Sequence, residues 1–393
     1  MNRYITIIAF LAGLTATCFA QQYGWTTLTY PSSTDILKRI YVSGNEAWLL
    51  ANDKLLYSGN YPSVQFSQIF SSSFTFSDMT FIEQNSKKYG WLVGSDSYGA
   101  RTIDDSALVW QDVYVGGEAL GCVSFPDTAV GYSTDTGRSL FKTTDGGATW
   151  TEINNSFSVS SINGLVFIDS LIGYFVGSSP AFKKTTDGGL TWTNVGSVTG
   201  SMVDVFFYDK THGWAVGVRD IFYLDGTSWI RVANNSGSTL YSVFFASATE
   251  GWAVGMNGTI IHSTDGGATW SKQESGTSVT LRDVFFTSPT NGYVVGNDGT
   301  ILHYTSLTTG VSEVIKDEDI IALPNPTNGI VRFNLQGNEQ INRIELFDMQ
   351  GKQVLYSDKV TNDFIDLSAL DNGIYFLKLE TPDKIYKQKI IKK

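Results

Sequence analysis

The chain has 393 residues, a formal net charge of −11 at pH 7, 42% hydrophobic and 13% aromatic residues. This length allows more than one globular domain, and the acidic balance argues against a role in binding nucleic acid or an anionic membrane, which needs a basic surface. The sequence contains no nucleotide-binding loop, HExxH motif, Cys–His zinc spacing or GxSxG elbow, and therefore no signature of these enzyme classes.

The first twenty residues have the organisation of a secretory signal peptide. Arg3 gives a basic start, an apolar run spans residues 5–14, and Cys18-Phe19-Ala20 places small residues at the end. The run is too short to span a membrane as a mature helix. We therefore expect a cleaved signal peptide over residues 1–20 and no transmembrane segment in the mature chain. Cys122 would then be the only cysteine left, as an inert core thiol.

One pattern recurs seven times in the next part of the chain, and Gly213-Trp214-Ala215-Val216-Gly217 is a clear copy. Its aromatic residue stands at positions 48, 91, 132, 174, 214, 252 and 293, which are 38 to 43 residues apart. Each unit starts with a strand such as Asp204-Val205-Phe206-Phe207, and a Trp such as Trp270 opens its fourth strand. Four short strands at this period predict an all-β, seven-bladed propeller over residues 21–305.

The seventh unit lacks its fourth strand. After Ile301–Tyr304 the chain continues without a Thr-Trp pair, whereas Tyr23–Thr26 near the other end resembles Ala268–Ser271 of the sixth unit. We predict that this N-terminal strand completes blade seven. Closing the ring in this way would remove exposed sheet edges.

Three turns carry the same motif, Thr-Asp-Gly-Gly-x-Thr-Trp, in Thr144–Trp150, Thr186–Trp192 and Thr264–Trp270. These turns resemble the Asp-boxes of bacterial sialidases and related propellers. Together with the Gly-Trp-Ala-Val-Gly strands, they are similar to the photosystem II stability/assembly factor family, whose seven-bladed propellers act as non-catalytic scaffolds. We expect a structural role for the motif carboxylates, which would cap N–H groups of their own turns. They belong to Asp145, Asp187 and Asp265.

The composition changes beyond an acidic segment, residues 306–319, which is predicted to be a linker. Three motifs follow in order, namely Leu323–Gly329, Ile344–Val354 and Leu370–Leu379, before a lysine-rich end. This part resembles the C-terminal sorting domain of the type IX secretion system, a small Ig-like β-sandwich on exported Bacteroidota proteins. The resemblance implies that residues 320–393 engage the type IX machinery and carry the protein across the outer membrane, to the cell surface or the medium.

A candidate site comes from aligning the residue before each first-strand motif. In chain order these residues are Arg39, Asp78, Cys122, Gly164, Asp204, Ser242 and Asp283. The innermost strands of a propeller begin at one mouth of its central channel, so three carboxylates and one arginine are expected there. Tyr241 and Arg282 stand one position earlier. The connection at residues 95–101 is predicted to be a long loop at this mouth.

Three interpretations of this mouth are open. The first is a binding site for a protein or glycan, built from Arg39, Asp78, Asp204, Tyr241, Arg282 and Asp283. The second is an acidic rim that is solvated, holds a cation or caps loops. The third is an acid–base pair of a polysaccharide hydrolase, drawn from Asp78, Asp204 and Asp283. We predict a secreted, non-enzymatic binding scaffold that needs no cofactor or metal, with the hydrolase as the alternative.

Overall fold

The computed structural model describes residues 22–307 and 321–393, except for residues 31, 63–64, 155–156, 179–180, 197–199, 219, 235, 335–340, 349–351, 359–363 and 382–384. The signal peptide predicted over residues 1–20 lies outside this range, as does most of the linker predicted over residues 306–319. The chain divides into two compact units, Met1–Leu307 and Thr308–Lys393.

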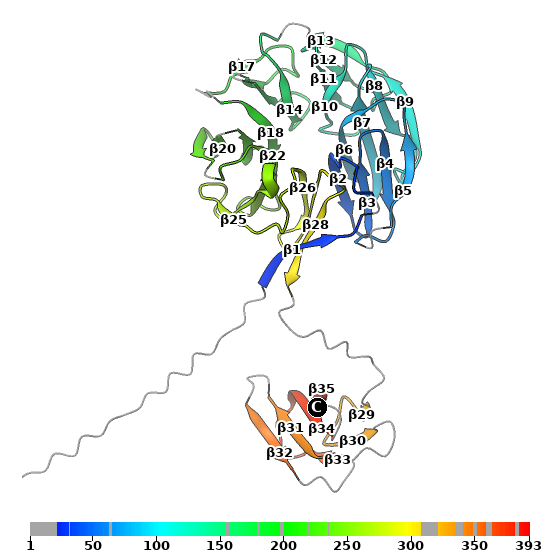
Figure 1. The fold of residues 1–393 in the computed structure, drawn as a ribbon, viewed down its shortest axis with the longest axis vertical. Coiled ribbons are helices and arrows are strands. Elements are labelled where there is room, and N and C mark those ends of the chain that lie inside the picture. Colours follow the sequence, from blue (N-terminus) through cyan, green and yellow to red (C-terminus); the bar gives the residue numbers. More distant parts are fainter. Residues whose placement is uncertain are drawn as a thin grey trace, which may run out of the picture. The chain divides into compact units, whose positions relative to one another are not determined.

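The first unit is a ring of seven four-stranded antiparallel sheets, which we call blades (Figure 1). This confirms the predicted β-propeller. Blades one to three contain β2 (Arg39–Ser43), β3 (Glu46–Leu50), β4 (Lys54–Ser58), β5 (Ser67–Ser71), β6 (Phe76–Gln84), β7 (Lys87–Gly94), β8 (Tyr98–Thr102), β9 (Trp110–Tyr114), β10 (Leu120–Ser124), β11 (Gly131–Asp135), β12 (Leu140–Thr143) and β13 (Thr151–Asn154).

The remaining blades repeat this order of strands, with one 3-10 turn, η1 (Met256–Gly258), in blade six. Blades four and five contain β14 (Ile162–Phe167), β15 (Gly173–Gly177), β16 (Phe182–Thr185), β17 (Thr193–Asn194), β18 (Met202–Phe207), β19 (Gly213–Gly217), β20 (Asp220–Leu224) and β21 (Trp229–Ala233). Blades six and seven contain β22 (Leu240–Phe245), β23 (Gly251–Gly255), β24 (Ile260–Ser263), β25 (Ser271–Gln273), β26 (Leu281–Ser288), β27 (Asn291–Gly296), β28 (Ile301–Leu307) and β1 (Gln22–Leu28).

The repeated aromatic residue joins each blade to the next. Trp214 is fully buried, stacks on Phe245 of the following blade at 3.5 Å between ring centroids, and donates its indole N–H to the Gly266 carbonyl at 2.8 Å. Trp91 makes the equivalent bond to Gly146 at 2.9 Å. The apolar repeat is therefore an interface between blades, and it explains why strands with this pattern are buried on both faces.

Both glycines of the repeated motif are required by close packing. A Cβ on Gly213 would lie 2.5 Å from the ring of Phe207, which covers the start of the strand. A Cβ on Gly217 would lie 2.2 Å from the carbonyl oxygen of Ser201. Only glycine lets the backbones come this close, so the motif marks the position where the first two strands of a blade meet.

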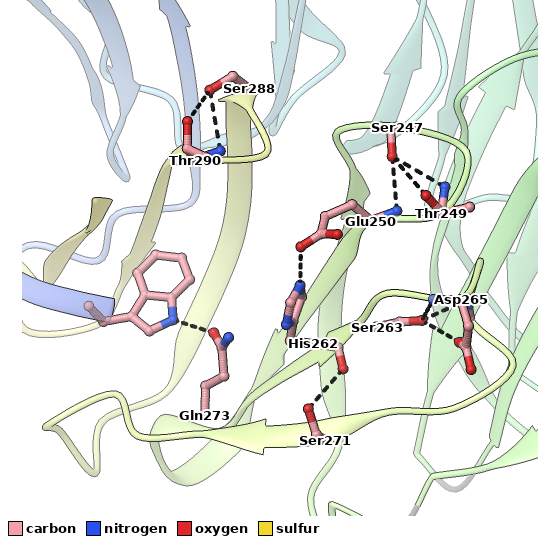
Figure 2. A network of polar contacts seen from close by, with 12 residues as sticks. Ser247, Thr249, Glu250, His262, Ser263, Asp265, Ser271, Gln273, Ser288 and Thr290 are labelled. Carbon is pink, nitrogen blue, oxygen red and sulfur yellow. Dashed lines mark hydrogen bonds and ion pairs between the residues drawn. The ribbon is translucent and has the colours of Figure 1, made fainter. Parts of the chain in front are cut away.

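The ring is closed by the N-terminal strand β1, which pairs antiparallel with β28 from Gln22 opposite Leu307 to Leu28 opposite Ile301. The indole N–H of Trp25 donates to Gln273 of blade six at 2.8 Å (Figure 2). Because the pairing continues through Ser306 and Leu307, the last strand of the propeller ends two residues later than the predicted boundary at residue 305.

The second unit contains two sheets around one core. One sheet comprises β29 (Ile321–Leu323), β30 (Ile330–Asn334) and β33 (Phe364–Asp366), and the other β32 (Gln353–Ser357), β31 (Arg343–Phe347), β34 (Gly373–Glu380) and β35 (Ile385–Lys392). Val331, Leu346 and Leu377 contribute to the core from both sheets. Asn325 of the first sorting motif accepts a hydrogen bond from Ile391 N–H at 2.9 Å and donates one to the Lys389 carbonyl at 2.6 Å. This motif therefore holds the last strand of the chain in place.

Candidate functional site

The candidate site is the central channel of the propeller. The first strand of each blade contacts the first strands of both neighbouring blades, so these strands form the channel wall. A cavity of 330 Å³ in the channel is lined by all seven aligned residues, which we call the polar ring. They are Arg39, Asp78, Cys122, Gly164, Asp204, Ser242 and Asp283. The structure thus brings together residues that are separated by up to 244 positions in the sequence.

The three carboxylates of the polar ring bind to the backbones of neighbouring blades. Asp78 accepts from Val123 N–H at 3.0 Å, and Asp204 accepts from Val243 N–H at 2.9 Å. Asp283 accepts from the N–H of Ile40 at 2.9 Å. Each carboxylate therefore connects its own first strand to that of the next blade. A hydrogen bond between a charged carboxylate and an amide is stronger than a neutral one, which makes these contacts suited to holding the ring together.

Arg39 is the cation among these carboxylates. Its Nε donates to Asp78 at 2.7 Å, and its Nη1 donates to the carbonyl of Lys38 at 3.2 Å. Burial raises the pKa of Asp283 to about 6 against the opposing effect of Arg39, and burial also raises the pKa of Asp204. One arginine thus faces three acidic groups, and burial favours a proton on two of them.

Both oxygens of the Asp283 carboxylate are already bonded. Oδ2 accepts from Ile40 N–H, and Oδ1 accepts from the hydroxyl of Ser242 at 3.0 Å. A pKa near 6 is in the range of a general acid, but a catalytic acid needs an oxygen that reaches the substrate. The geometry therefore favours a structural role for this side chain.

Tyr241 and Arg282 are not among the residues that line the cavity. Together with Lys38 they directly precede the polar-ring residues Ser242, Asp283 and Arg39 in the chain, and we call these three residues the basic rim. The guanidinium of Arg282 lies 5.9 Å from the centre of the Tyr241 ring, and its Nε donates to Asn297 at 2.6 Å. Lys38 donates its ammonium to the Phe76 carbonyl, and burial together with Arg282 and Arg39 lowers the pKa of Lys38. The mouth thus combines two cations and an aromatic ring outside the polar ring.

Aromatic side chains also line the cavity. They stand two residues beyond the polar-ring positions on the same strands, in Tyr41, Phe206, Phe244 and Phe285. Their ring centroids are 5.4 Å apart for Tyr41–Phe285, 5.1 Å for Phe244–Phe285 and 4.9 Å for Phe206–Phe244. These residues were not predicted to line the channel, although alternation along a strand places position i+2 on the same face as position i.

The Asp-box carboxylates act within their own turns. Asp145 accepts from the N–H and the hydroxyl of Thr149, at 2.9 and 2.6 Å, and from the hydroxyl of Thr143 at 2.8 Å. The bonds from Thr149 lower the pKa of Asp145 to about 2. Asp187 and Asp265 are bonded in the same way, and Figure 2 shows the contact of Asp265 with Ser263.

A fourth turn of this kind, not predicted from the sequence, lies in blade two. Asp104 accepts from the N–H groups of Leu108 and Val109 at 3.1 and 2.9 Å, and Trp110 closes the turn through the Ala107 carbonyl at 3.1 Å. This turn is one residue longer than an Asp-box and has no glycine pair, which hides it from a motif search. The predicted long loop at residues 95–101 is also corrected, because β8 begins at Tyr98 and leaves only a short turn.

Within the residues that the structure describes, no group of three or more His, Cys, Asp or Glu side chains is arranged to hold a metal ion. Cys122 is buried in β10, and burial raises the pKa of its thiol to about 12. A thiol held in its neutral form is a poor nucleophile. In the same described part of the chain, no helix has the length and apolar character needed to cross a membrane.

The blades, their closure and their channel define the first unit as a seven-bladed β-propeller. Residues 225–305 match the family described as photosynthesis system II assembly factor YCF48. Residues 322–393 match the secretion system C-terminal sorting domain. The chain therefore carries a YCF48-like propeller followed by a sorting domain, and the sorting domain indicates export to the cell surface or the medium.

Solved structures agree with this fold. YCF48 from Cyanidioschyzon merolae is 18% identical, with a TM-score of 0.58 over 72% of this chain and 98% of that one. YCF48 bound to a D1 peptide is 16% identical, with a TM-score of 0.59 over 72% and 97% of the two chains. The WD40 propeller domain of Doa1 is 11% identical, with a TM-score of 0.59 over 74% and 99%. At these identities the likeness establishes the fold alone. No curated protein sequence matched the chain.

Proposed function

We propose that this protein is an exported, non-enzymatic propeller that binds a protein or a glycan at the mouth of its channel. The sorting domain supports export by the type IX machinery. The propeller supplies a rigid ring on which exposed side chains hold fixed positions, and such a scaffold suits recognition.

The observation that carries this proposal is that the polar-ring carboxylates are already hydrogen-bonded within the protein. Asp78, Asp204 and Asp283 are bonded to backbone N–H groups of adjacent blades. In the basic rim, the guanidinium of Arg282 lies over the ring of Tyr241. This positive charge suits an anionic group of a ligand. We therefore propose that the polar-ring carboxylates hold the blades together and that the basic rim contacts the ligand.

A neighbouring structure points to the class of ligand. One YCF48 propeller was solved bound to a D1 peptide. By analogy, a protein segment is the first ligand class to test here, with acidic residues to complement the basic rim, and an acidic glycan is the second. Fold analogy supports the choice of test and does not identify the ligand.

The test is a binding measurement on the purified full chain. Immobilised protein would be screened against acidic peptides and an array of acidic and neutral glycans, beside the variant Arg282→Gln. We expect a ligand whose affinity falls at least about tenfold in the variant, since a charge-assisted hydrogen bond contributes roughly 1.5–3 kcal/mol. Equal binding by both proteins would contradict a role for the rim.

A polysaccharide hydrolase is the second candidate, because burial raises the pKa of Asp283 to about 6. A group with this pKa can donate a proton near neutral pH. The bonds on both of its oxygens weigh against this role. Release of sugar from a substrate would decide between the two candidates.

A further inference from the structure

The turn between the third and fourth strands is shortened in blade five. It runs from Leu224 to Trp229, which is two residues shorter than Ser263–Trp270 in blade six. In the longer turn, the second glycine packs on the preceding blade, and a Cβ on Gly267 would lie 2.7 Å from Trp214. In the short turn, a Cβ on Gly226 would meet no atom within 4 Å. The short turn therefore does not fill the space that an Asp-box fills elsewhere.

A hollow of 440 Å³ lies at this position, between blade four and the short turn of blade five. Figure 1 marks these two blades by β17 and β20. The hollow is on the outer part of the blades, because its walls come from second, third and fourth strands and not from the first strands of the channel. Its principal lining residues are Tyr174, Lys184, Thr193, Lys210, Thr227 and Trp229.

Two hydrogen-bond donors in the hollow lack the acceptors that the equivalent groups of other blades have. Trp270 of blade six donates to the Gly267 carbonyl of its own Asp-box at 3.0 Å, and the hydroxyl of Tyr132 in blade three donates to the Ser170 carbonyl of blade four at 2.7 Å. The corresponding groups at the short turn are the hydroxyl of Tyr174 and the indole N–H of Trp229. Neither group has a hydrogen-bond partner among the residues that the structure describes. Both line the hollow, so an acceptor on a bound molecule can take the place of the missing carbonyls.

A lysine adds a positive charge to this lining. The ammonium of Lys184 lies 5.4 Å from the centre of the Tyr174 ring and has no ion pair within the described part of the chain. Blade three contains the same pair, with Lys142 at 5.3 Å from Tyr132. There the Asp-box of blade four covers the lysine, since a Cβ on Gly188 would lie 3.3 Å from its ammonium. The pair in blade four, in contrast, lines the hollow.

We propose that this hollow binds the carboxylate-bearing sugar of an acidic glycan, that is, a uronic acid. Lys184 would pair with the carboxylate, the hydroxyl of Tyr174 would donate to a sugar oxygen, and the ring of Trp229 would contact the apolar face of the pyranose. The hydroxyls of Thr193 and Thr227 complete a lining suited to the sugar hydroxyls, and the volume is within the range of small-ligand sites, about 300–1,000 Å³. The site lies outside the channel and does not depend on the function proposed for the channel mouth.

The test is titration of the full chain with methyl glucuronide, beside its neutral counterpart methyl glucoside, followed by NMR or calorimetry. We expect saturable binding of the glucuronide and affinity at least about fivefold weaker for the glucoside. Lys184→Gln should weaken glucuronide binding about tenfold, because it removes the charge-assisted contact. Lys142→Gln is the matched control, since its lysine is covered, and it should bind as the wild type does.

A second variant tests the hollow itself. Replacing residues 224–229 with the eight-residue turn Ser263–Trp270 should fill the space and abolish binding while the circular dichroism spectrum stays unchanged. Glucuronide bound at the channel mouth would lose affinity in Arg282→Gln and keep it in Lys184→Gln, whereas glucuronide bound in the hollow would show the reverse, so the two sites are distinguishable. No binding of glucuronide, unchanged binding by Lys184→Gln, or tighter binding of a glutamate-containing peptide than of glucuronide would each overturn the proposal.

Discussion

The carboxylate of Asp283 accepts a hydrogen bond from the backbone N–H of Ile40 at 2.9 Å, although 243 residues separate them in the chain. Asp283 belongs to blade seven and Ile40 to blade one, so this bond spans the junction where the ring closes. Strand β1 completes blade seven at the same junction. The inner wall and the outer edge of the ring are thus closed independently, by a side chain and by a strand.

The closing strand should carry a measurable part of the stability. Trp25 packs against Phe286 and Tyr304 and bonds to Gln273, so Trp25→Ala should lower the free energy of unfolding by about 3 kcal/mol. Thr27→Ala, at an exposed position on the same strand, should change it by less than about 0.5 kcal/mol. Chemical denaturation measures both. Equal stabilities of the two variants would show that β1 is not needed for closure.

The second glycine of the repeated motif should not tolerate a methyl group. A Cβ on Gly255 would lie 2.0 Å from the Thr239 carbonyl oxygen, so Gly255→Ala should destabilise the propeller by about 2 kcal/mol or more. Gly121 is the control, because the nearest atom to a Cβ there lies 3.9 Å away, and its replacement by Ala should cost less than about 1 kcal/mol. The melting temperatures of both variants give the comparison, and a stable Gly255→Ala protein would refute the packing explanation.

Stability should depend on pH through Asp283. Its pKa rises from 3.8 to about 6 on folding, so the folded state binds more protons than the unfolded state between about pH 4 and 6. The contribution of Asp283 to the free energy of unfolding therefore falls as the pH rises through that window. Asp283→Asn cannot titrate, so we expect the stability of the variant to rise relative to that of the wild type from pH 4 to 7.

Asp145 provides a control, because its effect on stability changes with pH in the opposite direction. Its pKa is lowered from 3.8 to about 2, so its contribution is present above about pH 4 and is lost as the pH falls towards 2. Thermal unfolding of the wild type, Asp283→Asn and Asp145→Asn would be followed from pH 2 to 7. Parallel curves for the wild type and Asp283→Asn would contradict the raised pKa.

The channel should not hydrolyse glycosidic bonds. We expect the full chain to release no sugar from a panel of polysaccharides and sialosides, because the carboxylate oxygens of Asp204 and Asp283 are bonded within the ring. Reducing-sugar and chromatographic assays measure this. Turnover that the double variant Asp204→Asn, Asp283→Asn loses would instead make the protein a hydrolase.

The second unit should be required for export. In a host with type IX machinery, deletion of residues 321–393 should leave the propeller on the inner side of the outer membrane, as detected by fractionation. Asn325→Ala, which removes two contacts to β35, should reduce export in the same direction. Full export of the truncated chain would contradict a sorting role for these residues.

The sequence predicts the propeller well because its signal is repeated. An aromatic residue between two glycines marks the second strand of most blades, and the resemblance of Tyr23–Thr26 to Ala268–Ser271 places β1 in blade seven. Aligning the repeats also brings Asp78, Asp204 and Asp283 to one cavity. The partners of their oxygens could not be predicted, because those partners are backbone N–H groups of other blades and depend on the spacing between blades.

The hollow at blade five shows a different limit. The short turn Leu224–Trp229 is visible in the sequence as Leu-Asp-Gly-Thr-Ser-Trp, which resembles an Asp-box with two residues missing. The effect of two missing residues falls on the preceding blade, where Tyr174 and Lys184 line the hollow. A deletion in one repeat thus changes the surroundings of residues in the neighbouring repeat. This effect cannot be predicted from either repeat alone.

The pairing of Gln22 with Leu307 places the entry and the exit of the ring next to each other. A short loop joining these two residues would leave every blade complete, and the chain could then be opened in the turn between any two blades. Such circular permutants should keep the same propeller, since exposed turns tolerate new termini. Any blade can therefore come first along the chain, and only the order of the blades around the ring is constrained.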